Sequence, residues 1–261
     1  MSRISEVFAE LKSKRRGGFI PFITAGDPDL SATEELLREL ARAGADIIEV
    51  GVPFSDPVAD GPVIQRASER ALGRGTNLKG VLECITAAKR QTNVPIVLFS
   101  YYNPLLQFGL EKLATAASRT GVDAVLVTDL IPEEAGSWTS LLVANNLDPI
   151  FLVAPTTNED RLRLITQQAR GFVYAISRTG VTGARENINE NAESLVRRIR
   201  GVTPLPVAVG FGVSTPAQVR EVWHYADAAV VGSAIVSEIE RLSGDRDLVR
   251  KVGQFARNLT Q

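Results

Sequence analysis

Residues 19–50, FIPFITAGDPDLSATEELLRELARAGADIIEV, carry the pattern that decides the fold. Residues 19–24 and 46–50 are short, apolar and rich in β-branched side chains, which is typical of strands that are buried on both faces. Between them, residues 31–43 place apolar side chains at helical spacing. A strand, a helix and a second strand in this order predict a βαβ unit with parallel strands.

The same alternation continues to the end of the chain. Six further strands are expected at residues 94–99 (VPIVLF), 123–128 (DAVLVT), 148–153 (DPIFLV), 171–176 (GFVYAI), 205–209 (LPVAV) and 227–231 (DAAVV). Each is followed by a helical pattern, for example at residues 214–225. Eight consecutive βα units close most naturally into a (β/α)8 TIM barrel, an α/β fold.

An open, doubly wound sheet is the alternative to a barrel. Such sheets often carry a glycine-rich G-x-G-x-x-G after the first strand, whereas the first strand here runs into residues 24–28, TAGDP. One local conflict remains within the first strand, because Pro21 cannot donate a backbone hydrogen bond to a neighbouring strand.

Two loops are longer than the rest, and both follow the carboxyl ends of strands. They are loop 2 at residues 51–77 and loop 6 at residues 177–191. Barrel enzymes build their active sites at this end, so we expect the specialised chemistry there. No linker or low-complexity tract interrupts the pattern, and a single catalytic domain over residues 1–261 is expected.

The amino-terminal residues predict one extra helix before the barrel. Ile4, Val7, Phe8 and Leu11 recur at helical spacing, and nothing in this region has the apolar run of a signal peptide. No stretch is long and apolar enough to suggest a membrane span. With Cys84 as the sole cysteine, the sequence favours a soluble cytoplasmic protein.

Composition argues against several partner classes. Hydrophobic residues make up 44% of the chain, enough for a sizeable core. The formal net charge is −1, so no global field attracts nucleic acid or anionic lipid. His224 is the only histidine and falls on an expected outer helix, which disfavours a histidine triad or a zinc site.

Glu49 is the first candidate for catalysis. It lies near the carboxyl end of the second expected strand, among apolar neighbours. A carboxylate there is costly unless it is paired or functional, so a structural ion pair at the barrel rim is the alternative. Burial would raise its pKa toward the range that is useful for proton transfer.

Two further acids, Asp56 and Asp60, lie in loop 2 between closely spaced prolines. Either aspartate could simply form a turn, and Asp60 could cap a helix beginning near Pro62. Taken together with Glu49, however, two carboxylates at one barrel mouth suggest an acid/base pair.

Glycine-bearing loops predict a phosphate site. Gly180 and Gly183 fall in loop 6, Gly210 and Gly212 follow the seventh expected strand, and Gly232-Ser233 follows the eighth. Glycines let backbone N–H groups approach an anion, and a helix amino terminus adds a favourable partial charge. The loops after strands seven and eight are the recurrent phosphate site of barrels.

Residues 49–62, EVGVPFSDPVADGP, resemble the signature of the tryptophan synthase alpha chain family. The resemblance covers nearly the whole chain. Further matching pieces are residues 21–28 (PFITAGDP), 101–104 (YYNP), 177–183 (SRTGVTG) and 209–212 (VGFG). The two departures that we note, Ile131 and Asn158 where many members have proline, are peripheral.

The resemblance implies a lyase that cleaves indole-3-glycerol phosphate to indole and glyceraldehyde 3-phosphate by a retro-aldol reaction, without metal or organic cofactor. Glu49 would be the general acid/base, and Asp60 the carboxylate that binds indole N1–H, with Tyr174 and Thr182 contributing nearby. The remaining implied contacts are Phe22, Tyr102 and Phe211 around the indole, and Gly183, Gly212, Gly232 and Ser233 around the phosphate.

Members of the family usually work in an α2β2 complex, passing indole through a tunnel to a pyridoxal-phosphate-dependent beta chain. Asp56 is then a candidate interface residue. The alternatives are a stand-alone lyase that releases free indole, and a catalytically silent barrel that only regulates the beta chain. A different phosphosugar isomerase would share the phosphate loops but would not require the segment at residues 49–62.

Overall fold

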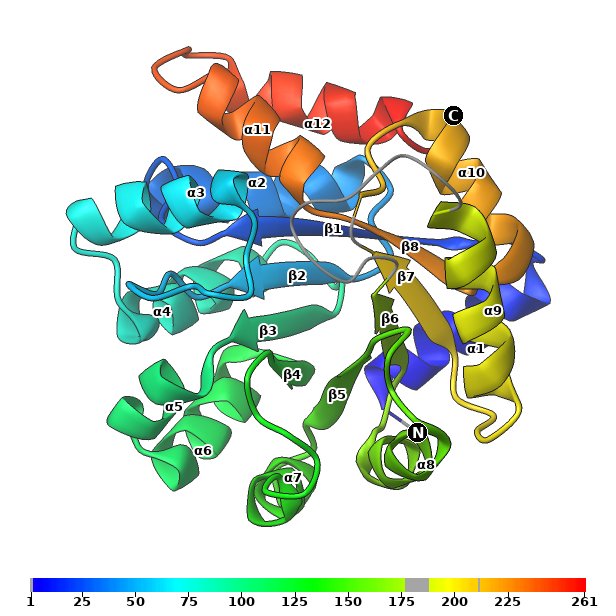
Figure 1. The fold of residues 1–261 in the computed structure, drawn as a ribbon. Coiled ribbons are helices and arrows are strands. Elements are labelled where there is room, and N and C mark those ends of the chain that lie inside the picture. The colour runs from blue at the N-terminus through cyan, green and yellow to red at the C-terminus, as the bar shows by residue number, and fades with distance from the viewer. Residues whose placement is uncertain (1, 177–187, 211) are drawn as a thin grey trace.

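The eight expected strands are all present and form one closed parallel barrel in the order β1 to β8 (Figure 1). The computed structural model describes residues 2–176, 188–210 and 212–261. The strands are β1 (Gly18–Thr24), β2 (Ile48–Gly51), β3 (Ile96–Ser100), β4 (Ala124–Val127), β5 (Asp148–Val153), β6 (Val173–Ile176), β7 (Val207–Gly210) and β8 (Ala228–Val231).

Helices surround the barrel (Figure 1); α2 to α10 connect consecutive strands, α1 precedes β1, and α11 and α12 follow β8. They are α1 (Arg3–Ser13), α2 (Leu30–Arg42), α3 (Pro62–Gly73), α4 (Leu78–Lys89), α5 (Tyr102–Phe108), α6 (Leu110–Thr120), α7 (Gly136–Ala144), α8 (Glu159–Gln168), α9 (Ile188–Arg200), α10 (Pro216–Tyr225), α11 (Ser233–Arg241) and α12 (Leu248–Asn258). Within the described ranges, no helix has both the length and the apolar character that crossing a bilayer requires.

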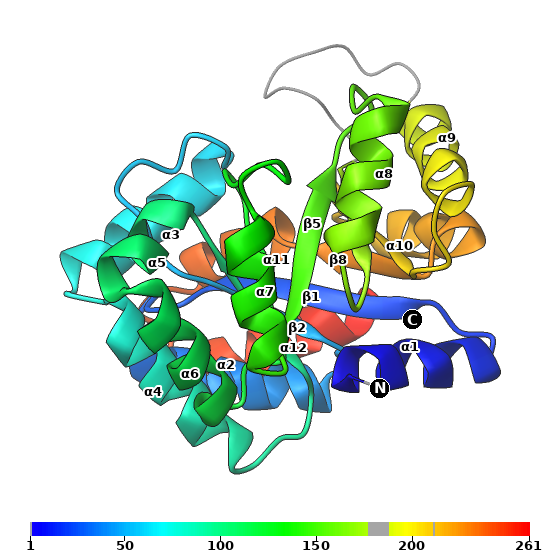
Figure 2. The same cartoon turned by 90° about the horizontal axis from the view of Figure 1, so that it is seen from below.

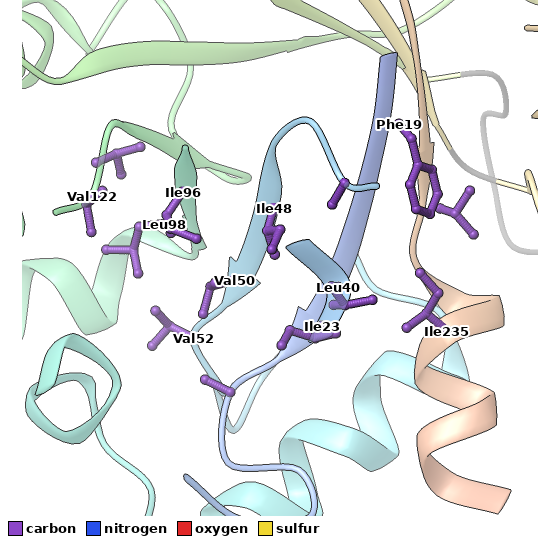
Figure 3. Close-up of a cluster of buried hydrophobic side chains, with 14 of the residues drawn as sticks. Phe19, Ile23, Leu40, Ile48, Val50, Val52, Ile96, Leu98, Val122 and Ile235 are labelled. Atoms are coloured by element: carbon purple, nitrogen blue, oxygen red, sulfur yellow. The ribbon is translucent and has the colours of Figure 1, made fainter. Parts of the chain in front are cut away.

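Strand alternation divides the apolar residues into two clusters. Phe19, Ile23, Ile48 and Val50 face outward and pack against the surrounding helices, as Leu40 of α2 illustrates in Figure 3. The alternating positions face the barrel axis, among them Ile20, Phe22, Ile47, Val97, Phe99, Leu126, Tyr174 and Val230. Glu49 falls between Ile48 and Val50 on β2, so it belongs to the inward-facing set.

The register of β1 explains how Pro21 is tolerated in a buried strand. β1 pairs with β8 from Gly18 to Pro21 and with β2 from Phe22 to Thr24. Pro21 lies just before the pairing with β2 begins, so the ladder between β1 and β2 starts only after the residue that lacks a donor.

Helix α1, which the amphipathic pattern predicted, closes the amino-terminal end of the barrel. Ile4, Phe8 and Leu11 are buried in the same cluster as the inward-facing strand residues. The Phe8 ring lies 5.7 Å from that of Phe172, which directly precedes β6. Figure 2 shows α1, in blue, along the lower side of the molecule next to β1. The opposite end of the barrel is left for the site.

The structure corrects the expected extent of both long loops. Loop 2 contains a full helix, α3, which begins at Pro62 as expected, so its irregular parts are residues 52–61 and 74–77. Helix α9 begins at Ile188, so the last four residues assigned to loop 6 are helical. The rest of loop 6, residues 177–187, lies outside the described residues.

Candidate active site

A cavity of about 310 Å³ lies at the carboxyl end of the barrel strands. Residues from six strands or the loops that follow them meet around it, which is where barrel enzymes place their chemistry. Its lining consists of Phe22, Glu49, Asp60, Gly61, Pro62, Val63, Ile64, Phe99, Tyr174, Gly212, Val230, Gly232 and Ser233. Two carboxylic acids in a largely apolar cavity have few ways to be solvated.

Glu49 extends into the barrel from β2, where it pairs in register with Phe22 of β1 and Val97 of β3. The residue is 1% exposed, and its Oε1 atom has no hydrogen-bond partner among the described residues. Burial raises the pKa of Glu49 to about 8, because the charged form cannot be solvated there. The structural ion pair considered for Glu49 is absent from the ion pairs of the described residues.

Asp60 is held by a hydrogen bond from Tyr101. The Tyr101 hydroxyl donates to Asp60 Oδ2 at 3.0 Å and accepts from the Ala59 N–H at 3.0 Å. Burial raises the pKa of Asp60 to about 6, and the bond from Tyr101 lowers it in part. Asp60 does not cap α3: the N-cap residue is Gly61, which makes no side-chain capping bond. The capping interpretation is therefore wrong.

Tyr174 lies on the inward face of β6 and lines the same cavity. Its ring is 4% exposed. Burial raises the pKa of Tyr174 well above its usual value, and the charges of Glu49 and Asp60 act in the same direction. Tyr174 is therefore a neutral phenol close enough to both carboxylic acids to be influenced by their ionisation.

Aromatic and aliphatic side chains form the apolar wall. Phe22 and Phe99 meet edge to face, with ring centroids 5.3 Å apart and planes at 78°. Gly51 makes this arrangement possible, because a Cβ atom there would lie 2.5 Å from Phe22 Cζ. Val63 and Ile64, at the start of α3, complete a wall that suits a flat apolar group.

Another part of the lining suits an anion. Gly232 is the N-cap residue of α11 and Ser233 begins this helix, so backbone N–H groups without intrahelical partners face the cavity. Gly212, which follows β7, has a φ of +94°, a conformation that favours glycine. The cavity thus combines an apolar wall, two carboxylic acids and a helix amino terminus with the character to bind an anion.

The structure brings together most, but not all, of the expected site residues. Phe22, Glu49, Asp60, Tyr174, Gly212, Gly232 and Ser233 line the cavity. Thr182, Gly183 and Phe211 lie outside the described residues. Tyr102 does not line the cavity; it begins α5, and its backbone N–H donates to Asp129 Oδ1 at 2.7 Å. The neighbouring Tyr101 is the tyrosine that contacts Asp60.

Sequence reasoning missed Tyr101 and Phe99. Val97, Phe99 and Tyr101 alternate along β3 and its end, so the period of two that places Phe99 inside the barrel also places Tyr101 on that side. Val63, Ile64 and Val230 gave no such signal, because apolar residues on a helix or a buried strand are usually core.

The remaining candidates lie away from the cavity. Asp56 is exposed and accepts a hydrogen bond from Ser55 Oγ at 2.5 Å. Cys84 is buried in α4, where its thiol donates to the carbonyl of Leu30, and burial raises its pKa to about 12. Among the described residues, no cluster of three or more histidine, cysteine or acidic side chains could hold a metal ion.

Comparison with known proteins identifies the family of this chain. The tryptophan synthase alpha chain family profile matches residues 8–261. A tryptophan synthase alpha chain from Geobacter sulfurreducens is 52% identical over 261 residues, covering 100% of this chain and 98% of the relative. One from Geobacter sp. (strain M21) is 48% identical over 261 residues, covering 100% and 97%.

Solved structures share the fold over almost the entire chain. Tryptophan synthase subunit alpha from Legionella pneumophila superposes with a TM-score of 0.91 at 34% identity, covering 99% of this chain and 97% of that chain. A chain of the aminoacrylate-bound tryptophan synthase from M. tuberculosis superposes with a TM-score of 0.89 at 34% identity, covering 100% of both. This chain therefore belongs to the tryptophan synthase alpha chain family.

Proposed function

We propose that this chain cleaves indole-3-glycerol phosphate to indole and glyceraldehyde 3-phosphate, using Glu49 and Asp60 as its two working carboxyl groups. Family membership supports the lyase reaction in tryptophan biosynthesis. One observation carries the residue assignment: two carboxylic acids with raised pKa values line one cavity with an apolar wall and an anion-binding turn.

Glu49 would act as both acid and base. With a pKa of about 8 it is mostly protonated at neutral pH and can deliver a proton to indole C3. The resulting carboxylate then accepts the proton of the side-chain hydroxyl. The carbon–carbon bond to C3 breaks, its electron pair returns to the ring, and the former hydroxyl carbon becomes an aldehyde. Glu49 ends protonated as it began, so the step needs no cofactor.

Asp60 would stabilise the charge that develops between these proton transfers. Protonation at C3 places positive charge on the indole ring, centred at N1. With a pKa of about 6, Asp60 is largely ionised at neutral pH and can accept the hydrogen bond from N1–H. Tyr174, a neutral phenol beside both acids, would contribute to the same polar cluster.

The remaining lining residues would orient the substrate. The ring would lie against Phe22, with Phe99, Val63 and Ile64 completing the wall. The phosphate would bind at Gly212, Gly232 and Ser233. Thr182 and Gly183 on loop 6, and Phe211 after β7, remain predicted contacts.

We propose that residues 1–261 form one catalytic domain, because strands from the whole chain close the barrel. We also propose that this domain works in the cytoplasm.

The family assignment supports a tryptophan synthase beta chain as partner, and we propose an α2β2 assembly. Three exposed apolar side chains support a docking surface at the carboxyl end of the barrel: Val58, Leu106 and Ile131, which are 84%, 51% and 41% exposed. They follow the consecutive strands β2, β3 and β4, and Asp56 lies two residues before Val58. Large exposed apolar groups of this kind are typical of interfaces.

An indole-release assay tests the proposal. The purified chain is given indole-3-glycerol phosphate with and without a beta chain, and both products are measured. We expect indole and glyceraldehyde 3-phosphate in equal amounts, and faster release when the beta chain is present. Failure to release indole under either condition would reject the lyase assignment. Equal rates under both conditions would favour the stand-alone enzyme.

A further inference from the structure

A cluster of ion pairs joins the segment after β1 to helices α3 and α11. We call its members, Asp27, Arg66, Arg70 and Glu240, the clasp. Arg70 Nε and Nη2 donate to Asp27 Oδ1 and Oδ2 at 2.9 and 2.7 Å, and Arg70 Nη1 donates to Glu240 Oε1 at 2.7 Å. Arg66 makes a second two-pronged contact with Glu240, at 2.8 and 2.7 Å. Arg70 is thus the member that contacts both acids.

Burial distinguishes the two arginines of the clasp. The Asp27 side chain is 2% exposed and that of Arg70 is 29% exposed, whereas Arg66 is 50% exposed. Exposed pairs contribute little, because solvent screens them and ordering two long side chains costs entropy. A buried two-pronged pair resists separation, because either partner alone would leave a charge unsolvated. The Arg70–Asp27 contact is therefore the rigid part of the clasp.

Each element joined by the clasp also lines the cavity. β1 supplies Phe22 and is followed by Asp27. Helix α3 begins directly after Asp60 and Gly61, and Arg70 lies about two turns into it. Helix α11 begins after Gly232, and Glu240 lies about two turns into it. Since helices are stiff over two turns, fixing each helix two turns from its start fixes where its first residues lie.

We propose that Arg70 is a positioning residue for the reaction, because its simultaneous pairing with Asp27 and Glu240 sets the place of Asp60 relative to the anion-binding turn at Gly232 and Ser233. This inference rests on the proposed function. Asp60 acts on a charge that exists only during the reaction, whereas the turn binds a phosphate that is charged throughout. A displaced α3 should therefore lower kcat more than it weakens phosphate binding.

The test compares Arg70→Met with Arg66→Met, a change on the same helix that removes contacts to the same Glu240 but none to Asp27. We measure kcat and KM for indole-3-glycerol phosphate and the inhibition constant of glycerol 3-phosphate. Arg70→Met should lower kcat by about ten- to a hundred-fold, as expected for a small misplacement of a working group. Its inhibition constant for glycerol 3-phosphate, which has no ring to contact the start of α3, should stay within about threefold of wild type, and Arg66→Met should change kcat by less than about twofold.

Arg70→Met leaves Asp27 buried without its cation, so a second variant removes that charge as well. Asp27→Asn/Arg70→Met should recover the melting temperature, measured by circular dichroism, while kcat stays low. Recovery of kcat together with stability would overturn the proposal, because the loss would then come from the unpaired charge. An Arg70→Met enzyme with wild-type kcat, an equal loss in Arg66→Met, or a rise in KM alone would also overturn it. Absence of indole release by the wild-type chain would instead reject the proposed function.

Discussion

The Tyr101 hydroxyl joins two neighbouring points of the segment at residues 52–61: it donates to the carboxylate of Asp60 and accepts from the N–H of Ala59, both at 3.0 Å. The Tyr101 ring itself is 3% exposed and lies 5.1 Å from the ring of Phe54. A buried aromatic side chain at the end of β3 thereby fixes a carboxylate that belongs to the connection after β2.

Tyr101→Phe should therefore lower kcat/KM and change its pH dependence. The hydroxyl stabilises ionised Asp60, so its removal should raise the pKa of Asp60 above about 6 and reduce the ionised fraction at neutral pH. We expect a loss of about tenfold at pH 7, in line with one hydrogen bond to a charged group. Tyr102→Phe is the matched control. Tyr102 donates its backbone N–H to Asp129, and this bond does not involve the hydroxyl that the substitution removes. Equal losses in both variants would contradict this role for Tyr101.

The pKa values of the two acids predict a bell-shaped pH profile for kcat/KM. Activity should rise as Asp60 loses its proton near pH 6 and fall as Glu49 loses its proton near pH 8. Phosphate monoesters also titrate near pH 6, so Asp60→Asn separates the two causes. The lower limb should disappear in Asp60→Asn if Asp60 is responsible, and persist if the substrate phosphate is.

Strand order and the candidate Glu49 followed from the sequence, because buried parallel strands have continuous apolar runs and a carboxylate within such a run is conspicuous. Glu49 lies among Ile47, Ile48 and Val50. The partner of Asp60 was missed. Two tyrosines adjoin at residues 101 and 102, and only alternation along β3, continued one residue past its end, distinguishes Tyr101, on the side of Phe99, from Tyr102, which begins α5.

The clasp was not predictable. Asp27, Arg70 and Glu240 are far apart in the chain, and arginines on an amphipathic helix ordinarily face solvent. Only barrel closure, which brings β1 and α11 to the same side as α3, turns them into one cluster.

Glu49→Gln should reduce activity and raise stability in alkaline solution. Loss of general acid/base catalysis should lower kcat by about 10²–10⁴-fold. The folded-state pKa of Glu49 is raised to about 8, so the native state favours the protonated form. The corresponding stability is complete below the ordinary value of 4.5 and is lost as pH rises through 8. Glutamine avoids this loss.

Thermal melts of wild type and Glu49→Gln at pH 5 and pH 9 check the second part. The variants should melt at similar temperatures at pH 5, and Glu49→Gln should be the more stable at pH 9, by on the order of a few kcal/mol. A difference in stability that is the same at both pH values would show that the buried charge is not its source.

Gly51 should be required for the shape of the apolar wall. A Cβ atom at this position would lie 2.5 Å from Cζ and 2.9 Å from Cε2 of Phe22, closer than non-bonded atoms approach. β2 is held between β1 and β3, so the Phe22 ring must give way. Since Phe22 lines the cavity, its displacement should intrude on the space for the indole ring. We expect Gly51→Ala to lower kcat/KM by about ten- to a hundred-fold.

A smaller residue at position 22 should relieve this clash, so Phe22→Leu/Gly51→Ala should be more active than Gly51→Ala alone. Gly73→Ala controls for the loss of a glycine, because a Cβ atom there would meet nothing within 4 Å, and it should retain wild-type kcat/KM. Additive effects of the two substitutions would mean that they act independently. The steric explanation would then fail, because it requires the cost of the alanine methyl group to depend on the ring that it displaces.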